Sequence, residues 1–375
     1  MLSRQIQSEA ESNWESVKIV DAHTEKERQA IYRFRYQVQV GEMNRNIPGI
    51  DYRHEYITDE LDSWSYLVYA ILDGRIIGTV RATVGNVSDF PDELIQVLQL
   101  ERFRQFDPAS KNICLGTKLM VDPQFRKTPV FFQLMVRGYE ILREHNVQFN
   151  FGGCNPYLIP MYEKLGYRRF TAGFQDPGYG FIVPILLLPE DSEHLKAVRS
   201  PYLRIARKFA NSPAAREWYL THFPEAAKYP VGPLTSEQER WDYIIQRIGH
   251  PLDVLPVLRD LDEAGARKLL HIATTIECTQ GHEYIRQGDV CNELNILIAG
   301  EMVISDKAGR TFRAGTGDII GSVGLLKQCY HAVDAVAATD CEILTVSRFS
   351  FEKLQRALPE MADKLQFNNQ VRERE

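Results

Sequence analysis

The sequence has no long hydrophobic run. Its longest apolar stretch, residues 181–188, is interrupted by Pro184 and is far shorter than the roughly 20 residues that a helix needs to cross a bilayer. The N-terminal segment carries Glu9, Glu11 and Glu15 and lacks the apolar stretch of a secretory signal peptide. We therefore expect no membrane span and a cytoplasmic protein.

An excess of positive charge is also missing. The 44 Lys and Arg against 50 Asp and Glu give a net charge of -6, whereas nucleic-acid-binding domains usually carry a basic excess. The six cysteines form no Cys-x-x-Cys pair and show no His spacing typical of a tetrahedral zinc site. We expect no nucleic-acid partner, no metal ion and reduced structural thiols.

The length of 375 residues is too great for one ordinary core and indicates two domains. Alternating apolar and polar residues around Asp73-Gly74 predict a hairpin over 66–84. Strands and helices then alternate, which predicts an α+β mixed sheet with some parallel pairing. The predicted elements are a strand at 113–122, a helix reaching Glu144, a strand at 147–152, a short helix ending at Gly166, and strands near 168–174 and 181–188.

The second half of the chain has a different pattern. Residues 190–260 combine helical segments with seven prolines and predict a linker with helices. From about residue 261 to 349, short strands recur with glycine at the turns, as in a small β-roll, and helix returns over 351–371. We therefore divide the chain into a first domain at 1–200, a helical linker at 201–252 and a second domain at 253–375.

The order of motifs in the first domain carries a resemblance. A strand, an Arg-rich turn, a helix and a strand are followed by Asn155-Pro156 and by residues 162–167. This order resembles the GNAT fold, and the Asn-Pro variant resembles bacterial-type long-chain N-acyl amino acid synthases. Arg35, the acidic residues 59–62 and the Gly-x-x-Arg motif ending at Arg81 are similar to positions that those enzymes share with acyl-homoserine-lactone synthases.

The resemblance implies an N-acyltransferase that moves an acyl group from a pantetheine thioester to the amine of an amino acid or similar small acceptor. It implies that Tyr162 protonates the leaving thiolate. Asp59, Glu60 and Asp62 would hold the acceptor amine or relay its proton, and Arg35 and Arg81 would order this acidic set by ion pairing. An aromatic packing role for Tyr162 and an ordinary solvated turn for the acidic residues stay open.

The donor site is expected around the start of the helix that reaches Glu144. Backbone amides at a helix N-terminus bind phosphate, and Arg126 and Lys127 add positive charge beside Thr128. By the resemblance, Val121 would give the oxyanion its backbone N–H, and Asn155 would contribute to binding the donor.

The sequence departs from its relatives at several positions. Leu115 and Lys118 replace a usual Glu and Arg, and Pro129 and Phe131 replace small glycines that admit a diphosphate. We expect a pantetheine arm on an acyl carrier protein as the donor rather than free coenzyme A, and no permanently bound cofactor. A basic set is able to meet an acidic carrier protein: Arg126, Lys127, Arg137, Lys164, Arg168 and Arg169.

The second domain carries a separate resemblance. Glycine-anchored turns at 281–289, 295–301 and 317–321 resemble the cyclic-nucleotide-binding domain family over about 254–367. That family holds the ribose with Glu in a Gly-Glu motif and the cyclic phosphate with Arg in an Arg-Ala motif. This chain has Gly321-Ser322 and His331-Ala332 at those positions. An imidazole offers less positive charge than a guanidinium, so binding of a cyclic nucleotide is doubtful.

Two other functions stay open from the sequence. One is a nucleotide-regulated protein lysine acetyltransferase, and the other is a non-catalytic sensor of acyl groups or nucleotides. A homodimer also stays open, and the sequence fixes neither the acyl chain length nor the acceptor.

Overall fold

The computed structural model describes residues 16–43, 45, 47, 49–106, 112–361 and 363–365. The chain divides into two compact units. The first consists of Met1–Gly153 and Ile185–Pro224, and the second of Cys154–Pro184 and Glu225–Glu375. The domain boundaries expected at residues 200 and 252 stay predictions, and the expected end of the last helix at Val371 lies outside the described residues.

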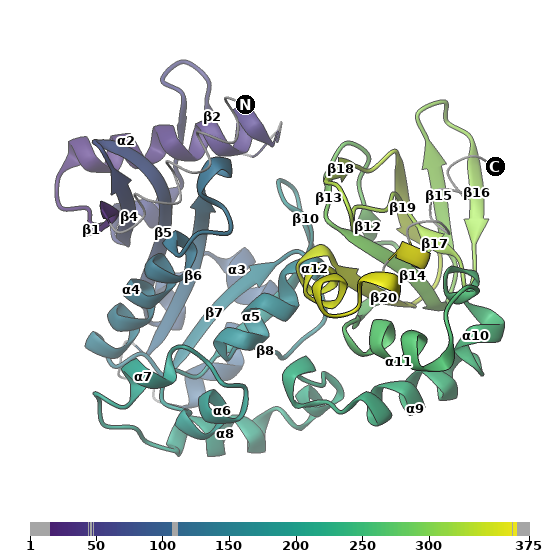
Figure 1. Cartoon of the computed structure of the whole chain (residues 1–375). Coiled ribbons are helices and arrows are strands. Elements are labelled where there is room, and N and C mark those ends of the chain that lie inside the picture. The colour runs from purple at the N-terminus through teal and green to yellow at the C-terminus, as the bar shows by residue number, and fades with distance from the viewer. Residues whose placement is uncertain are drawn as a thin grey trace. The chain divides into compact units, whose positions relative to one another are not determined.

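A mixed sheet organises the first unit (Figure 1). Strands β1, β4, β5 and β6 pair antiparallel, whereas β6 and β7 pair parallel. Strand β10 follows β7 in the sheet, and the unit boundary falls within it at Pro184. The strands are β1 (Lys18–Asp21), β4 (Tyr66–Leu72), β5 (Arg75–Gly85), β6 (Ile113–Val121), β7 (Phe149–Cys154) and β10 (Gly180–Leu187). The expected mixed sheet, with an antiparallel start and some parallel pairing, is confirmed.

The turn between β4 and β5 shows why these residues form a hairpin. Leu72 pairs with Arg75, so the loop contains only Asp73 and Gly74. Both have positive φ, 50° and 79°, as a two-residue loop of this kind requires, and Asp-Gly adopts that conformation readily. The predicted hairpin is therefore present at its predicted turn.

Two helices cover much of this sheet. Helix α2 (Glu25–Tyr36) starts with a capping box, in which Thr24 and Glu27 satisfy each other's backbone amides, and it continues into the π-helical turn η2 (Gln37–Glu42). Helix α4 (Val130–Glu144) buries an apolar face that includes Leu134 and Tyr139. The Tyr139 hydroxyl donates a hydrogen bond of 2.6 Å to the Pro189 carbonyl.

The shorter elements of the first unit lie mainly in its connections. They are β2 (Ile50–Asp51), β3 (Tyr56–Ile57), η3 (Glu60–Ser63), η4 (Val87–Asp89), α3 (Asp92–Val97), η5 (Leu100–Gln105), η6 (Pro123–Phe125), α6 (Ser192–Ala197), α7 (Leu203–Ala206) and α8 (Ala214–His222).

Antiparallel strands form the roll of the second unit. One sheet has the order β11-β20-β14-β17 and another β12-β19-β15-β16, while β13 pairs with β18. The strands are β11 (Thr274–Cys278), β12 (Glu283–Ile285), β13 (Val290–Cys291), β14 (Glu293–Ala299), β15 (Met302–Asp306), β16 (Thr311–Ala314), β17 (Ile319–Ile320), β18 (Cys329–Tyr330), β19 (Val333–Ala337) and β20 (Cys341–Ser347). The predicted β-roll is confirmed.

Helices and two short strands complete the second unit. They are η7 (Pro156–Leu158), α5 (Ile159–Leu165), β8 (Arg168–Arg169), β9 (Phe174–Asp176), η9 (Gly232–Leu234), α9 (Glu237–Ile248), α10 (Pro251–Val254), η10 (Pro256–Leu258), α11 (Glu263–His271) and α12 (Arg348–Ala357). The turn η8 (Pro224–Lys228) contains the point where the first unit ends and the second resumes.

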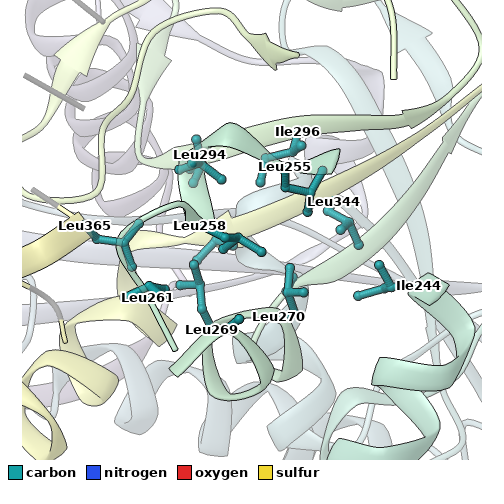
Figure 2. Close-up of a cluster of buried hydrophobic side chains, with 14 of the residues drawn as sticks. Ile244, Leu255, Leu258, Leu261, Leu269, Leu270, Leu294, Ile296, Leu344 and Leu365 are labelled. Carbon is teal, nitrogen blue, oxygen red and sulfur yellow. The ribbon is translucent and has the colours of Figure 1, made fainter. Parts of the chain in front are cut away.

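A single buried cluster joins the helices and the roll (Figure 2). Ile244 of α9 and Leu269 of α11 belong to the same cluster as Leu294 of β14 and Leu344 of β20. Burying a Leu or Ile side chain contributes about 1.5 to 3 kcal/mol. Helix α9, although it lies within the segment expected to be a linker, therefore contributes to the core of the C-terminal roll.

Among the described residues, none of the helices combines the length and apolarity needed to cross a membrane.

Candidate active site and regulatory pocket

Four of the predicted site residues form one buried ionic cluster in the first unit. Arg35 comes from the last turn of α2 and Arg81 from β5. Asp59 caps the 3-10 turn η3, which contains Asp62. The Asp59 carboxylate accepts from the Leu61 amide at 3.1 Å, and the Asp62 carboxylate accepts from the Asp59 amide at 3.0 Å. These hydrogen bonds within the turn hold both carboxylates in place independently of the arginines.

Both arginines converge on Asp62. The Arg35 Nη1 atom lies 2.9 Å from each Asp62 carboxylate oxygen. The Arg81 Nη1 atom lies 3.1 Å from Asp62 Oδ1 and also hydrogen bonds with Asp59. Arg35, Asp62 and Arg81 are buried, whereas the Asp59 side chain is 35% exposed. Asp59 is therefore the member of this set that is open to a small molecule.

The electrostatics of the cluster follow from burial and pairing. Burial lowers the pKa of Arg35, although the Asp62 charge opposes this shift. Burial tends to raise the pKa of Asp59, but hydrogen bonds and charge from Arg81 and Lys118 outweigh burial and hold it below its usual value. Asp59 is thus a carboxylate anion at neutral pH.

Lys118 was not predicted as a site residue, yet it belongs to this cluster. Its Nζ atom lies 3.3 Å from Asp59 Oδ2 and its side chain is 12% exposed. The pairing of β5 with β6 is irregular here, because Thr79 faces Met120 whereas Arg81 faces Thr117. Lys118 has a φ of 54°, which is uncommon for a residue with a side chain. Bulges with such backbone strain are frequent beside functional sites, but the sequence pattern gave no sign of this one.

The expected donor-binding residues lie at the end of β6 and the start of α4. The Arg126 guanidinium makes two hydrogen bonds of 2.6 Å with the Glu42 carboxylate and one of 3.1 Å to the Val121 carbonyl. The Thr128 hydroxyl donates to the Phe125 carbonyl at 2.7 Å. Lys127 is exposed and has a φ of 72°. Much of the Arg126 charge is thus neutralised by Glu42, a partner that the sequence analysis missed.

Tyr162 and Asn155 belong to the second unit. Tyr162 is half-buried in α5, and its ring packs edge-on against Tyr167 with 5.3 Å between the ring centroids. Burial raises the pKa of the Tyr162 hydroxyl well above its usual value of about 10. The Asn155 amide donates to the carbonyls of Tyr179 and Phe181 at 3.0 and 3.3 Å and so holds the connection between β9 and β10.

A second buried ionic network surrounds Glu163, the residue after Tyr162. The Glu163 carboxylate accepts from the Gly232 amide at 2.8 Å and lies 3.5 Å from the Arg169 guanidinium. Arg169 also donates to the carbonyls of Thr275 and Pro230, both at 2.7 Å. Burial raises the pKa of Glu163 despite the nearby Arg169 charge. This network joins α5 and β8 to the first strand of the roll.

The predicted regulatory pocket is filled by its own polar groups. The His331 Nε2 atom lies 3.1 Å from Glu293 Oε1, and the Ser322 amide donates to His331 Nδ1 at 3.3 Å. The Ser322 hydroxyl accepts from the Ala332 amide at 3.1 Å. Gly321 has a φ of 75°, and a Cβ there would lie 2.7 Å from His331 Nδ1. The structure therefore brings these four predicted residues together, and it adds Glu293, which the sequence analysis did not identify.

Comparisons with known families agree with this two-part architecture. Residues 30–188 match the family model "N-acyl amino acid synthase FeeM", and residues 275–357 match the "Cyclic nucleotide-binding domain". The two resemblances drawn from the sequence are thereby confirmed. The matches support an acyltransferase-type domain followed by a regulatory type of domain.

Similar solved structures include TofI in a ternary complex with an inhibitor and MTA. It is 15% identical, with a TM-score of 0.36, and the match covers 50% of this chain and 97% of that one. The catabolite activator protein of Thermus thermophilus is 25% identical, with a TM-score of 0.29, covering 32% of this chain and 58% of that one. A cyclic nucleotide-binding-like protein from Brucella abortus is 24% identical, with a TM-score of 0.25, covering 28% and 94%. No curated protein matches the chain in sequence.

Proposed function

We propose, from an N-acyl amino acid synthase-type domain at 30–188 and a cyclic nucleotide-binding domain at 275–357, that the protein is an N-acyltransferase. It would move an acyl group from a pantetheine thioester to the amine of an amino acid or similar small acceptor. The observation that carries this proposal is the Asp59 carboxylate, which is partly exposed and fixed by Arg81 and Lys118.

Asp59 fits the binding of the acceptor ammonium. An ionised carboxylate attracts a cationic amine, whereas its lowered pKa makes it a weak base for removing the proton. Asp62 has its oxygens occupied by Arg35 and Arg81, so we assign it the positioning of Asp59.

The charge of the whole cluster favours an amino acid over a simple amine. Three cations, Arg35, Arg81 and Lys118, surround two carboxylates, Asp59 and Asp62, which leaves one excess positive charge. An acceptor with both an amine and a carboxylate complements such a mixed cluster.

Tyr162 fits a donor of a hydrogen bond or proton to the leaving thiolate. Its raised pKa keeps the hydroxyl protonated at neutral pH, as this role requires. A fixed hydroxyl stabilises charge that develops on sulfur in the transition state, even before the proton is transferred. We propose this role for Tyr162 and a supporting role for Asn155 through the β9–β10 connection.

The start of α4 fits a single phosphate better than a diphosphate. Pro129 precedes the helix and offers no N–H, and Glu42 already neutralises Arg126. Lys127 is exposed at this turn. We therefore propose a carrier-protein-bound pantetheine arm, with Arg126, Lys127 and Thr128 near its phosphate and the β6 backbone around Val121 facing the thioester carbonyl.

Mass spectrometry of lipids tests the acyltransferase proposal. Extracts of cells that express the wild-type chain should contain new N-acyl amino acids, and Asp59→Asn should reduce them strongly. The exposed Asp51→Asn in the same unit is a matched control that should leave the products unchanged. Equal product levels with and without expression, together with acetylated lysines on cell proteins, would instead support the lysine acetyltransferase.

For the C-terminal domain we propose weak or absent binding of cyclic AMP. Both ring nitrogens of His331 are already engaged, and Glu293 adds a carboxylate to the position where a cyclic phosphate would lie. Losing a buried cationic partner costs about 2 to 5 kcal/mol of binding free energy, which moves a micromolar ligand toward the millimolar range.

Titration calorimetry at pH 7.5 tests this second proposal. The wild type should bind cyclic AMP no tighter than roughly millimolar, and Ser322→Glu with His331→Arg should restore binding. Micromolar binding by the wild type would contradict it.

A further inference from the structure

Four side chains of metal-binding types lie on two paired segments of the C-terminal roll. Cys291 and Glu293 are two residues apart, as are Cys329 and His331. Cys291 and Cys329 face each other directly in the antiparallel pair of β13 and β18. This pair ends at Cys291, and the contact of 3.1 Å between His331 and Glu293 shows that the residues two positions on meet beside it.

The distances bring the ligating atoms together. One ligand atom each from Cys291, Glu293 and His331 lies within 4.8 Å of the others. The distance of 3.1 Å between His331 Nε2 and Glu293 Oε1 is close to the roughly 3.3 Å that separates nitrogen and oxygen ligands around tetrahedral zinc. Cys329 faces Cys291 in the strand pair, but its thiol is not part of this group of ligand atoms. The three side chains of this cluster are buried, and Cys329 is half-buried.

We propose that Cys291, Glu293 and His331 form a binding site for a zinc-like divalent cation. Thiolate, imidazole and carboxylate together select zinc over magnesium or calcium, which prefer ligand sets made of oxygen alone. Three protein ligands leave the fourth position of a tetrahedral ion open. The expectation of no metal ion considered Cys-x-x-Cys and His spacings, and it did not consider ligands two residues apart on facing strands.

Ligation changes the hydrogen bonds of the neighbouring turn. Because His331 Nδ1 accepts from the Ser322 amide, the ring proton lies on Nε2 and points to Glu293. A metal bound at Nε2 moves that proton to Nδ1, so the Ser322 amide loses its acceptor. The Cys291 thiol, which lies 3.2 Å from the Ser322 carbonyl, gives its proton to solvent as the metal–sulfur bond forms.

The metal would therefore change the hydrogen bonds of the turn at Gly321-Ser322. This turn corresponds to the Gly-Glu motif that holds the ribose in the cyclic-nucleotide-binding domain family. The inference does not rest on acyl transfer, because the site lies wholly in the C-terminal roll and its test measures metal binding. A failed acyltransfer assay and a failed metal titration thus remain distinguishable.

Cobalt titration of the full chain tests the proposal. The protein is treated with a chelator, kept reduced and titrated with Co²⁺, which reports thiolate ligation through a near-ultraviolet charge-transfer band. We expect one equivalent to bind with this band, and Zn²⁺ to displace it. Cys291→Ser should abolish the band and weaken Zn²⁺ binding by at least about tenfold, because even supporting residues of metal sites contribute that much.

A second cross-strand cysteine pair supplies the matched control. Cys278 and Cys341 face each other in β11 and β20 and are also buried, but neither belongs to the cluster. Cys278→Ser should keep the band and the affinity. A wild type without a thiolate band, or a band that survives Cys291→Ser, would overturn the proposal.

Folding defects are separated from ligand loss by two further measurements. Cys329→Ser replaces the half-buried thiol opposite Cys291, outside the ligand set, and should keep the band while the far-ultraviolet circular dichroism stays unchanged. Zn²⁺ should raise the Tm of the wild type and of Cys278→Ser, since a ligand that binds only the folded state stabilises it. An equal rise in Cys291→Ser would show that the metal binds elsewhere.

Discussion

Each of the two buried ionic networks contains one more cationic side chain than carboxylates, but the cations have different kinds of partner. In the first unit, Asp59 and Asp62 balance three cations. In the second, Glu163 lies between Arg169 and Arg240, whose charges both act on it, and backbone carbonyls receive the Arg169 donors. In each network, therefore, the cationic side chains outnumber the carboxylates by one.

The pKa shifts show what this difference means. Pairing with Arg81 and Lys118 lowers the pKa of Asp59 against the effect of burial, whereas burial raises the pKa of Glu163 against the effect of Arg169. The first network thus favours Asp59 as an anion, while the second accommodates a neutral Glu163. Only the first is suited to hold a charged substrate in a fixed position.

The largest expected effect comes from breaking the first network. Asp62→Asn leaves the buried Arg35 without its carboxylate and leaves Arg81 paired with Asp59 alone, and removing one member of a buried ion pair costs about 3 to 5 kcal/mol. Urea denaturation at pH 7 should show this loss in the free energy of unfolding. Asp51→Asn, which changes an exposed carboxylate paired with His54, should change it by less than about 0.5 kcal/mol. Similar losses of unfolding free energy in Asp62→Asn and Asp51→Asn would contradict the distinction between the buried and the exposed carboxylate.

Next in size is the effect of Tyr162→Phe on turnover. The change removes one hydroxyl and keeps the ring packing with Tyr167, so turnover should fall about 100-fold or more while stability changes little. Single-turnover kinetics with an acyl-carrier-protein thioester would measure it. Tyr167→Phe removes a hydroxyl from the neighbouring ring and should retain turnover. Unchanged turnover in Tyr162→Phe would remove this residue from the mechanism.

The sequence predicted the parts of the structure that depend on local geometry. Asp73-Gly74 specifies its hairpin through two positive φ angles, and the apolar stripe of α4 specifies a helix through its spacing. The exposure of Asp59 relative to Asp62 depends on how α2, η3 and β5 pack. The pairing of Arg126 with Glu42 spans 84 residues, and no local pattern encodes it.

The cysteines also show that local sequence patterns do not encode contacts between distant residues. All six cysteines are free thiols in the structure, and the sequence contains no Cys-x-x-Cys pair. That Cys291 faces Cys329 is a matter of strand register, and a shift of one residue would turn the side chains to the other face. Register became visible only in the folded chain.

Glu163→Gln should have only a small effect on stability, in contrast to Asp62→Asn in the first network. Because the raised pKa of Glu163 means that the fold accepts its neutral form, Gln should change the unfolding free energy by less than about 1 kcal/mol. A raised carboxyl pKa stabilises the fold below the unfolded value near 4.5, and this contribution is lost as pH rises through the folded value. The wild type should therefore be more stable relative to Glu163→Gln at pH 4 than at pH 7. The opposite trend would show that the carboxylate is needed as an anion.

The smallest effect on stability is expected for Lys164, the residue after Glu163 in α5. Lys353 and Lys164 approach the same Phe349 ring, with 3.6 and 5.8 Å from each Nζ atom to the ring centroid. Burial and then the Lys164 charge lower the pKa of Lys353 to about 8. The unfolded chain keeps this proton up to its ordinary pKa of 10.5, so stability rises as pH increases from about 8 to 10.5.

Lys164→Gln removes one of the two like charges. It should stabilise the chain at pH 7, but by less than about 1 kcal/mol, because solvent screens the exposed Lys353 ammonium. The gain should fade as pH rises from about 8 toward 10.5, because Lys353 in the folded wild type then loses the charge that Lys164 repels. Urea denaturation at pH 7 and pH 10 measures the difference, and the exposed Lys268→Gln on α11 should give no such pH-dependent gain. A loss of stability in Lys164→Gln at pH 7 would contradict the repulsion between Lys164 and Lys353.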